Sequence, residues 1–468
     1  MKANRFSKVL LLALALSAAA AIVSQAQTVT TIANFPGYAP YSGLVQAPDG
    51  TFYGTNPGGE IGDEGSVYNV TASGTLATIC NFGFGSCPDG QFPTAPLVLA
   101  SNGYFYGTTQ QGGSALEGNL FKMTTAGAET NLYSFCVTTC DDGAEPEAAI
   151  IQAGNGELYG TTGSTVYKVT LNGTLTTIYS FLCSPTCADG VDPGALVQAS
   201  DGNFYGVTGS GGANNDGTVF RITPSGILTT LHNFNGEDGA TPLGSLVQLN
   251  GELYGVTYAG GKSGTFCQDG QDLACGTIFK ISLGGSFKNL HKFTGTDGGN
   301  PCCALTLGTD GNFYGTAQWA GANMSGTLFQ ITPAGTFTTL YNFCSQEFCL
   351  DGVRPTGSLL QAASGTFYGL TGEGGTQGNG VVYSLSMGLG PFVATAPTSG
   401  KVASNVIILG YNLTGTTSVT FNGIPASFTV ASDTEITTTV PAGATTGKVK
   451  VVTPTATLNS NVAFGVVP

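Results

Sequence analysis

Residues 195–234, ALVQASDGNFYGVTGSGGANNDGTVFRITPSGILTTLHNF, form the stretch that decides the fold. Four short segments rich in β-branched and aromatic residues are separated by Ser200-Asp-Gly202, by a glycine-rich loop and by Pro224-Ser-Gly226. Glycine accepts the positive φ of a tight turn, and Asp and Ser side chains hydrogen-bond to their own backbone there. The pattern therefore predicts four antiparallel strands joined by two tight turns and one longer loop.

The same unit recurs along most of the chain. The tripeptide Phe-Tyr-Gly, or its variant Leu-Tyr-Gly, returns seven times at a spacing of roughly fifty residues. Its tyrosines are Tyr53, Tyr106, Tyr159, Tyr205, Tyr254, Tyr314 and Tyr368. Four antiparallel strands per unit are typical of the blade of a β-propeller. The sequence thus predicts an all-β, seven-bladed β-propeller over residues 27–390.

The fourth strand of the unit predicts how the ring closes. Its pattern, Thr-Thr-Leu-x-Asn-Phe, has a first copy at residues 30–35, before the first Phe-Tyr-Gly, and is missing after Tyr383-Ser-Leu-Ser386. We therefore expect residues 28–35 to supply the outer strand of the last blade. Such an N-terminal strand closes the propeller and leaves no free edge between its first and last blades.

The motifs of the unit carry a family resemblance. The segments Tyr106-Gly-Thr-Thr109 with Gly112-Gly113, and Gly217-Thr-Val-Phe220, resemble the GloVer-type tandem repeats of bacterial secreted "choice-of-anchor" proteins. The resemblance covers about residues 28–390. It implies a secreted bacterial repeat protein and brings no known activity with it.

Residues 391–468 form a second domain. Alternating strands at a spacing of about 8–12 residues predict a small Ig-like β-sandwich. The string Ser418-Val-Thr-Phe-Asn-Gly423, followed by Val440-Pro-Ala-Gly443, resembles an IPT/TIG domain. That resemblance implies an accessory or spacing module of extracellular proteins without catalytic activity.

Residues 1–26 have the composition of a secretory signal peptide. Lys2, Arg5 and Lys8 precede an apolar run over residues 9–23, and Ser24-Gln-Ala26 offers small residues for cleavage. We therefore expect a protein that is secreted or on the cell surface and has no membrane span after signal removal. The chain has 14 basic and 28 acidic residues, and this acidity argues against nucleic acid as a partner.

Twelve cysteines in a chain expected to be secreted predict disulfides. Four pairs each lie within one connection between repeats and are expected to stiffen it: Cys80 with Cys87, Cys136 with Cys140, Cys183 with Cys187, and Cys344 with Cys349. Cys267, Cys275, Cys302 and Cys303 leave three pairings open, including a vicinal bridge. A zinc site is the functional alternative for these four, but we expect no metal and no cofactor.

Ligand-binding loops are expected at one end of the propeller, where the second-to-third-strand loops and the connections between repeats emerge. The motif Asp-Gly-x-x-Pro recurs in those connections, with Asp89, Asp142, Asp189, Asp238, Asp297 and Asp351. These carboxylates either ring the axis and attract cations or stabilise Asx-type turns. We favour the turns, because a specific site normally breaks the symmetry of a repeat.

Residues that break the repeat are therefore the candidate ligand-binding residues. Trp319, the only tryptophan, either stacks on a sugar ring or anchors its loop. Tyr258, Asp269 and Asp272 lie in the longest loop of the fifth repeat. The two aspartates of this loop either contribute oxygen ligands to calcium or form a solvated turn.

The two histidines argue against common catalytic devices. His232 and His291 occupy one position of the fourth strand, which other repeats fill with Ala33, Cys80, Tyr133, Tyr179 or Tyr341. They belong to the repeat, so no catalytic triad is expected. The sequence favours a non-catalytic binding or surface-assembly protein whose ligand is a glycan or an extracellular protein. The alternatives are a carbohydrate-active hydrolase or lyase with acidic residues at the channel mouth, and a structural spacer.

Overall fold

The computed structural model describes residues 28–58, 64–83, 87, 89–181, 183, 186–261, 267 and 275–467. The expected signal peptide lies outside these ranges. The described chain is all-β, with two short 3₁₀ turns at Cys140–Asp142 and Glu347–Cys349. None of its described helical segments is long and apolar enough to cross a membrane.

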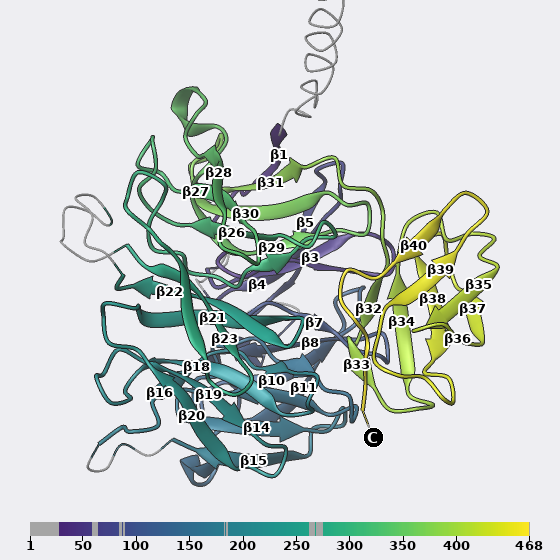
Figure 1. Ribbon diagram of the computed structural model, residues 1–468, viewed down its shortest axis with the longest axis horizontal. Helices are drawn as coiled ribbons and strands as arrows, with labels where there is room; N and C mark the ends of the chain where they lie inside the picture. The colour runs from purple at the N-terminus through teal and green to yellow at the C-terminus, as the bar shows by residue number, and fades with distance from the viewer. Residues whose placement is uncertain are drawn as a thin grey trace, which may run out of the picture.

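Seven antiparallel sheets follow one another over residues 28–386 (Figure 1). Their first strands are β2 (Val45–Gln46), β7 (Val98–Leu99), β12 (Ile151–Gln152), β17 (Val197–Gln198), β21 (Ala240–Leu249), β25 (Thr306–Leu307) and β29 (Val353–Gln361). The second strands are β3 (Phe52–Asn56), β8 (Phe105–Thr109), β13 (Leu158–Thr161), β18 (Phe204–Ser210), β22 (Glu252–Ala259), β26 (Phe313–Ala317) and β30 (Phe367–Glu373).

The third and fourth strands complete each sheet. The third strands are β4 (Ser66–Val70), β10 (Asn119–Met123), β14 (Thr165–Val169), β19 (Thr218–Ile222), β23 (Thr277–Ser282), β27 (Thr327–Ile331) and β31 (Val381–Ser386). The fourth are β5 (Leu76–Asn81), β11 (Glu129–Ser134), β15 (Leu175–Ser180), β20 (Leu228–Asn233), β24 (Phe287–Lys292), β28 (Phe337–Asn342) and β1 (Thr28–Asn34). Additional short strands are β6 (Gly90–Gln91), paired with β9 (Gln111–Gly112), and β16 (Val191–Pro193), paired with β18.

The Phe-Tyr-Gly motif packs neighbouring sheets against each other. The tyrosine ring of one sheet lies on the phenylalanine ring of the next, as in Tyr159 on Phe204, whose centroids are 4.1 Å apart. The glycine leaves room for the aromatic ring of the third strand: a Cβ at Gly54 would lie 2.4 Å from the Tyr68 hydroxyl. Because the second strands are buried along their whole length in most sheets, no sheet can be stable alone.

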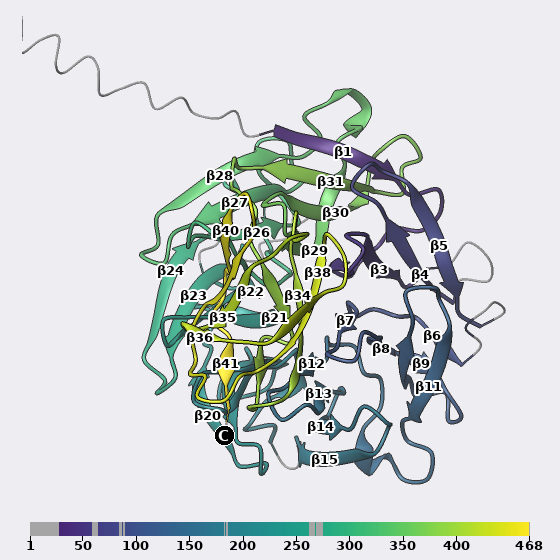
Figure 2. The same cartoon turned by 90° about the vertical axis from the view of Figure 1, so that its right-hand side faces the viewer.

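The first strands are shorter than their apolar sequence suggests, with two residues in five of the seven sheets. The two long first strands, β21 and β29, contain glycines at which the backbone of the next sheet approaches closely. A Cβ at Gly244 would lie 2.7 Å from the Ala304 amide nitrogen, and one at Gly357 would lie 2.7 Å from the Ser42 carbonyl oxygen. These glycines therefore mark the crowded centre around which the sheets are arranged in Figure 2.

The two ends of the repeat region lie side by side, as the sequence predicts. β1 pairs with β31 in antiparallel register, from Thr28 opposite Ser386 to Asn34 opposite Val381. Figure 2 shows this pair at the junction of the first and last sheets. The ring of Tyr368 also lies 4.3 Å from that of Phe52, which repeats across the junction the contact seen between other neighbouring sheets.

The C-terminal domain is a sandwich of two four-stranded sheets (Figure 1). One sheet contains β32 (Ala394–Ala396), β34 (Asn405–Leu409), β38 (Glu435–Thr439) and β37 (Phe428–Val430). The other contains β36 (Ile424–Pro425), β35 (Ser418–Phe421), β39 (Val449–Val452) and β40 (Thr457–Asn459), and a separate pair joins β33 (Ser399–Gly400) to β41 (Gly465–Val466). Val406, Ile408 and Val451 are among the residues that fill the core between the sheets.

The C-terminal domain is seated on the repeat domain rather than tethered beside it. Ile407 and Leu409 pack in one buried cluster with Leu97 and Leu99 of the second repeat. The Lys401 amide donates to the Gly154 carbonyl over 3.1 Å, and the Phe392 amide to the Ala363 carbonyl over 3.0 Å. These contacts lie at the end of the sheets where the first strand turns into the second, which leaves the opposite end open for the loops described next.

Candidate functional site

A cavity of about 660 Å³ lies at the end of the repeat domain away from the C-terminal domain. All seven sheets contribute to its wall, with residues that precede their first strands or lie within them. They include Ser42, Ala95, Ala149, Gly194, Gly244, Ala304 and Ser358. A cavity to which every repeat contributes lies on the common centre of the sheets, and its size is that of a small-molecule or oligosaccharide site.

The charged lining of this cavity is acidic. Glu145, Glu147 and Asp192 line one side, and no Lys, Arg or His is among the described residues of the wall. Burial raises the pKa of the Glu147 carboxyl, and the charges of Glu145 and Asp192 raise it further. The Gln110 side-chain amide donates to Glu147, and the Ser210 hydroxyl donates to Asp192 over 3.2 Å. The described lining of the cavity therefore carries acidic groups without a basic residue among them.

Two of these carboxylates occupy a special backbone position. The residue before proline in each Asp-Gly-x-x-Pro motif is left-handed, with φ between 51° and 55° at Phe92, Glu145, Asp192, Thr241, Asn300 and Arg354. Its amide donates to a carbonyl of the preceding repeat, as Glu145 does to Glu117 over 2.9 Å. A side chain at positive φ is unfavourable, yet none of the six positions is glycine. Six different side chains are thus displayed on one fixed backbone.

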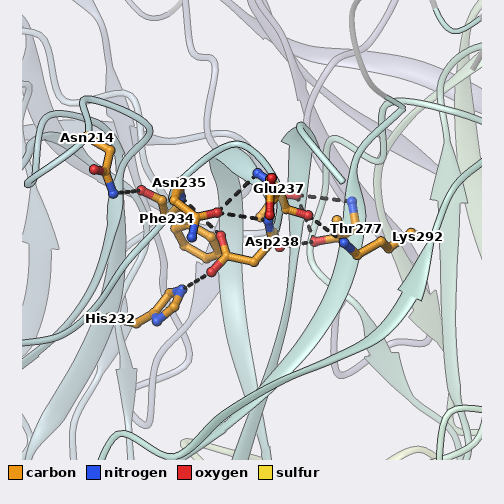
Figure 3. A network of polar contacts seen from close by, with 9 residues as sticks. Asn214, His232, Phe234, Asn235, Glu237, Asp238, Thr277 and Lys292 are labelled. Carbon is orange, nitrogen blue, oxygen red and sulfur yellow. Dashed lines mark hydrogen bonds and ion pairs between the residues drawn. The ribbon is translucent and has the colours of Figure 1, made fainter. Parts of the chain in front are cut away.

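The aspartate of the same motif has a structural role. In Figure 3 the His232 ring points to Asp238, with 3.0 Å between Nε2 and Oδ2, and the Asn235 amide also donates to this carboxylate. Asp297 accepts from His291 over 2.9 Å in the same way. Asp142, Asp189 and Asp351 accept from the hydroxyls of Tyr133, Tyr179 and Tyr341. These five aspartates therefore hold the turns to the fourth strands, and none of the six, Asp89 included, lines the cavity.

The histidines are bound into these turns. Besides its bond to Asp238, the His232 ring stacks on Phe287 of the next sheet at 3.9 Å, and His291 stacks on Phe337 at the same distance. Burial lowers the pKa of His232, although Asp238 acts in the opposite direction. Neither ring lines the cavity, so neither is placed to act as a base on a ligand held there.

The candidate residues named from the sequence do not form one site. Trp319 is half-buried, its backbone bridges to Gly299, and the Arg354 guanidinium covers one face of its ring at 3.6 Å. Arg354 also pairs with Glu373 over 2.6 Å. Tyr258 is half-buried at the end of β22, and its carbonyl accepts from the Asn300 side chain. Asp269 and Asp272 lie outside the described residues.

The cysteines pair within single connections. Sulfur atoms meet in Cys80–Cys87, Cys136–Cys140, Cys183–Cys187, Cys267–Cys275, Cys302–Cys303 and Cys344–Cys349. This resolves the three open pairings in favour of a vicinal bridge, and Cys302 and Cys303 both line the cavity. Among the described residues no group of three or more His, Cys, Asp or Glu side chains is placed to hold a metal ion.

Two exposed tyrosines, one of which (Tyr41) lines the cavity, are absent from the sequence-based candidates. Tyr38 and Tyr41, with 49% and 58% of their surface exposed, lie in the connection from β1 to β2. This connection, Pro36-Gly-Tyr-Ala-Pro40, is a seventh copy of the motif with proline in place of aspartate. Comparison of this copy with the other six would have marked it as the one that breaks the repeat.

Comparisons with known proteins agree with this architecture. The Gloeobacter/Verrucomicrobia repeat matches residues 20–165, 162–266 and 264–423, and an IPT/TIG domain matches residues 392–465. No curated protein matches the chain. A similar solved structure is a catalytically inactive virginiamycin B lyase from Staphylococcus aureus with quinupristin, at 15% identity and a TM-score of 0.53, covering 77% of this chain and 99% of the lyase.

A second similar structure is the extracellular domain of a protein described as a hybrid two-component system from B. thetaiotaomicron. It is 11% identical with a TM-score of 0.51, and the match covers 82% of this chain and 45% of that one. At such low identity both structures support a propeller-like fold and nothing finer. The family matches show that the chain belongs to the Gloeobacter/Verrucomicrobia repeat family and that residues 392–465 form an IPT/TIG domain.

Proposed function

We propose that this protein is a secreted, non-catalytic binding protein whose seven sheets are the blades of a β-propeller closed by β1. Its ligand, an extracellular glycan or protein, enters the central cavity. The repeat and IPT/TIG domains fit a non-catalytic extracellular protein, and the disulfides are compatible with that location. The IPT/TIG domain covers the other end of the sheets, so the ligand has one entrance.

The observation that carries this proposal is the composition of the cavity wall. The scaffold repeats, but the side chains that it presents to the cavity do not: Glu145, Asp192 and Thr241 occupy equivalent positions. Retaining a different side chain at each left-handed position has an energetic cost that a purely structural spacer would avoid by using glycine. Varied side chains on a rigid frame are typical of a binding surface.

Retention of the protein on polysaccharide and cell-envelope preparations tests the proposal. Ala149 lines the cavity, so Ala149→Trp should fill part of it and reduce retention at least about tenfold, a loss of about 1.4 kcal/mol. Ala126→Trp, in an exposed turn between β10 and β11, is the matched control and should bind like the wild type. Equal retention of all three proteins, or none by any, would show that the cavity is not the binding site.

A carbohydrate-active enzyme is the second candidate, favoured by one observation. Glu147 has a raised pKa beside two further carboxylates, which is the environment that a general acid needs. Release of reducing ends from a polysaccharide panel, lost in Glu147→Gln, would support the enzyme. Binding without turnover, unchanged in Glu147→Gln, would favour the non-catalytic protein.

A further inference from the structure

A second hollow adjoins the central cavity and has aromatic walls. Its volume is about 500 Å³, and it is lined by Tyr38, Tyr41 and Phe92 together with the polar side chains of Glu373 and Asn379. Tyr41 lines both this hollow and the central cavity, so the two adjoin at this side chain. Exposed aromatic rings beside polar groups are the combination on which the flat apolar face of a sugar packs while its hydroxyls hydrogen-bond.

The Tyr38 ring is held in place rather than loosely exposed. It lies against Gly58, where an added Cβ would be 2.6 Å from the Tyr38 Cγ atom, so only glycine leaves room for the ring. The Asn56 side-chain amide donates to the Tyr38 carbonyl over 2.5 Å and fixes the backbone. A ring positioned before the ligand arrives loses little conformational entropy on binding.

Trp319 is a weaker platform than these tyrosines. The Arg354 guanidinium covers one face of its ring, and that guanidinium is itself paired with Glu373. Stacking a sugar on the covered face would require breaking both contacts. The aromatic surface for a ligand is therefore the ledge formed by Tyr38, Tyr41 and Phe92, which belongs to the first two repeats and not to the sixth.

Charge selects among the possible glycans. At the ledge, Glu373 is neutralised by its ion pair with Arg354, whereas the adjoining cavity carries Glu145, Glu147 and Asp192 without a basic residue among its described lining. The chain as a whole has twice as many acidic as basic residues. Uronate, sulfate or phosphate groups would be repelled, whereas neutral sugars lose nothing in this field.

We infer that the ledge of Tyr38, Tyr41 and Phe92 is a subsite for a neutral oligosaccharide whose chain continues into the central cavity. The inference rests on the proposed binding function and specifies its ligand class. One sugar ring packs on the tyrosines. The Asn379 side-chain amide donates one hydrogen to the Pro36 carbonyl over 3.3 Å, and its second hydrogen is directed to a hydroxyl of that sugar. The next units pass Tyr41 toward the carboxylates, which accept further hydroxyl hydrogen bonds.

Calorimetric titration of the full chain with cellohexaose, mannohexaose and xylohexaose tests the inference, with hexagalacturonate as the charged probe. At least one neutral hexasaccharide should bind more tightly than hexagalacturonate. Tyr38→Ala and Tyr41→Ala should each weaken that binding about 3- to 10-fold, whereas Tyr41→Phe keeps the ring and should stay close to the wild type. Tyr411→Ala is the matched control, because Tyr411 is equally exposed at 50% but lies in the C-terminal domain.

The outcomes separate this inference from the proposed function. Neutral binding that both alanine variants leave unchanged would overturn the ledge while keeping a glycan in the central cavity. Preference for hexagalacturonate would overturn the charge argument. If no neutral hexasaccharide binds but retention on envelope preparations still depends on Ala149, the glycan inference is wrong and the binding function stands. If Ala149→Trp also leaves retention on envelope preparations unchanged, both the glycan inference and the proposed binding function are wrong.

Discussion

Glu129 provides a test of how the repeat tolerates an exception. It is the first residue of β11, where it lies opposite Met123 of β10. The fourth strands β5, β15, β20, β24 and β28 have Leu or Phe at the equivalent position. Those residues are Leu76, Leu175, Leu228, Phe287 and Phe337. The Glu129 Oε1 atom is buried and accepts no hydrogen bond from the described chain. Burial raises the pKa of this carboxyl to about 7, and the charge of Asp89 contributes.

The sign and size of the effect follow from this shift. The folded protein holds a proton that the unfolded chain releases near pH 4.5, so stability falls as the pH rises from about 4.5 to about 7. The full shift corresponds to about 3 kcal/mol above pH 7. Because Glu129 is only partly buried, solvent screening reduces the expected cost to about 1–2 kcal/mol.

Glu129→Gln and Glu129→Leu separate charge from apolar burial in urea unfolding at pH 5 and pH 8. Glu129→Gln should gain about 1–2 kcal/mol at pH 8 and much less at pH 5, where the wild-type carboxyl is protonated. Glu129→Leu should gain at both pH values, because it also restores the apolar residue of the repeat. A glutamine variant no more stable than the wild type at pH 8, or equally stabilised at both pH values, would refute the reasoning.

Two further predictions concern the turns and the closure. Because the pKa of His232 is lowered in the folded protein, the unfolded chain takes up a proton first as the pH falls below about 6.5, and the stability of the wild type should decrease there. His232→Tyr introduces the residue that other repeats have at this position. In urea unfolding it should show a smaller loss of stability between pH 7.5 and pH 5.5 than the wild type. Phe35→Ala should cost about 3–5 kcal/mol by chemical denaturation, as much as Phe343→Ala in the sixth repeat, because both rings are fully buried between sheets. A much smaller cost at Phe35 would mean that the N-terminal strand does not close the ring.

The sequence predicts most of the scaffold because the repeat supplies seven independent copies of each local signal. The offset of the Thr-Thr-Leu-x-Asn-Phe pattern predicts the pairing of β1 with β31, which needs no knowledge of packing. The contact of Arg354 with Trp319 could not be predicted in this way, since it joins side chains of different repeats whose directions depend on the left-handed φ of Arg354. The two tyrosines of the aromatic ledge were also not predicted as ligand-binding residues, because they precede the first complete repeat.

Two first strands depart from the repeat where the C-terminal domain contacts them. Four first strands end in glutamine, and β21 has Gln248 one residue before its end. The Gln198 side chain, for example, accepts the Gly154 amide of the preceding sheet over 2.8 Å. The second and sixth sheets have leucine instead, Leu99 and Leu307. These lie beneath the C-terminal domain: Leu99 packs with its Ile407, and the Leu307 carbonyl accepts the Asn461 side chain.

The replacement of glutamine by leucine at position 99 has a local physical reason. Before Leu99, the preceding turn has Pro48, which lacks the amide that a glutamine would bind, so an apolar side chain costs no hydrogen bond there. At Leu99 the polar contact between sheets is therefore replaced by apolar packing against the C-terminal domain. At the opposite end, Pro36 replaces the aspartate of the turn and the two tyrosines that follow are exposed. This second departure lies beside the central cavity, at the ledge on which we propose that a sugar binds.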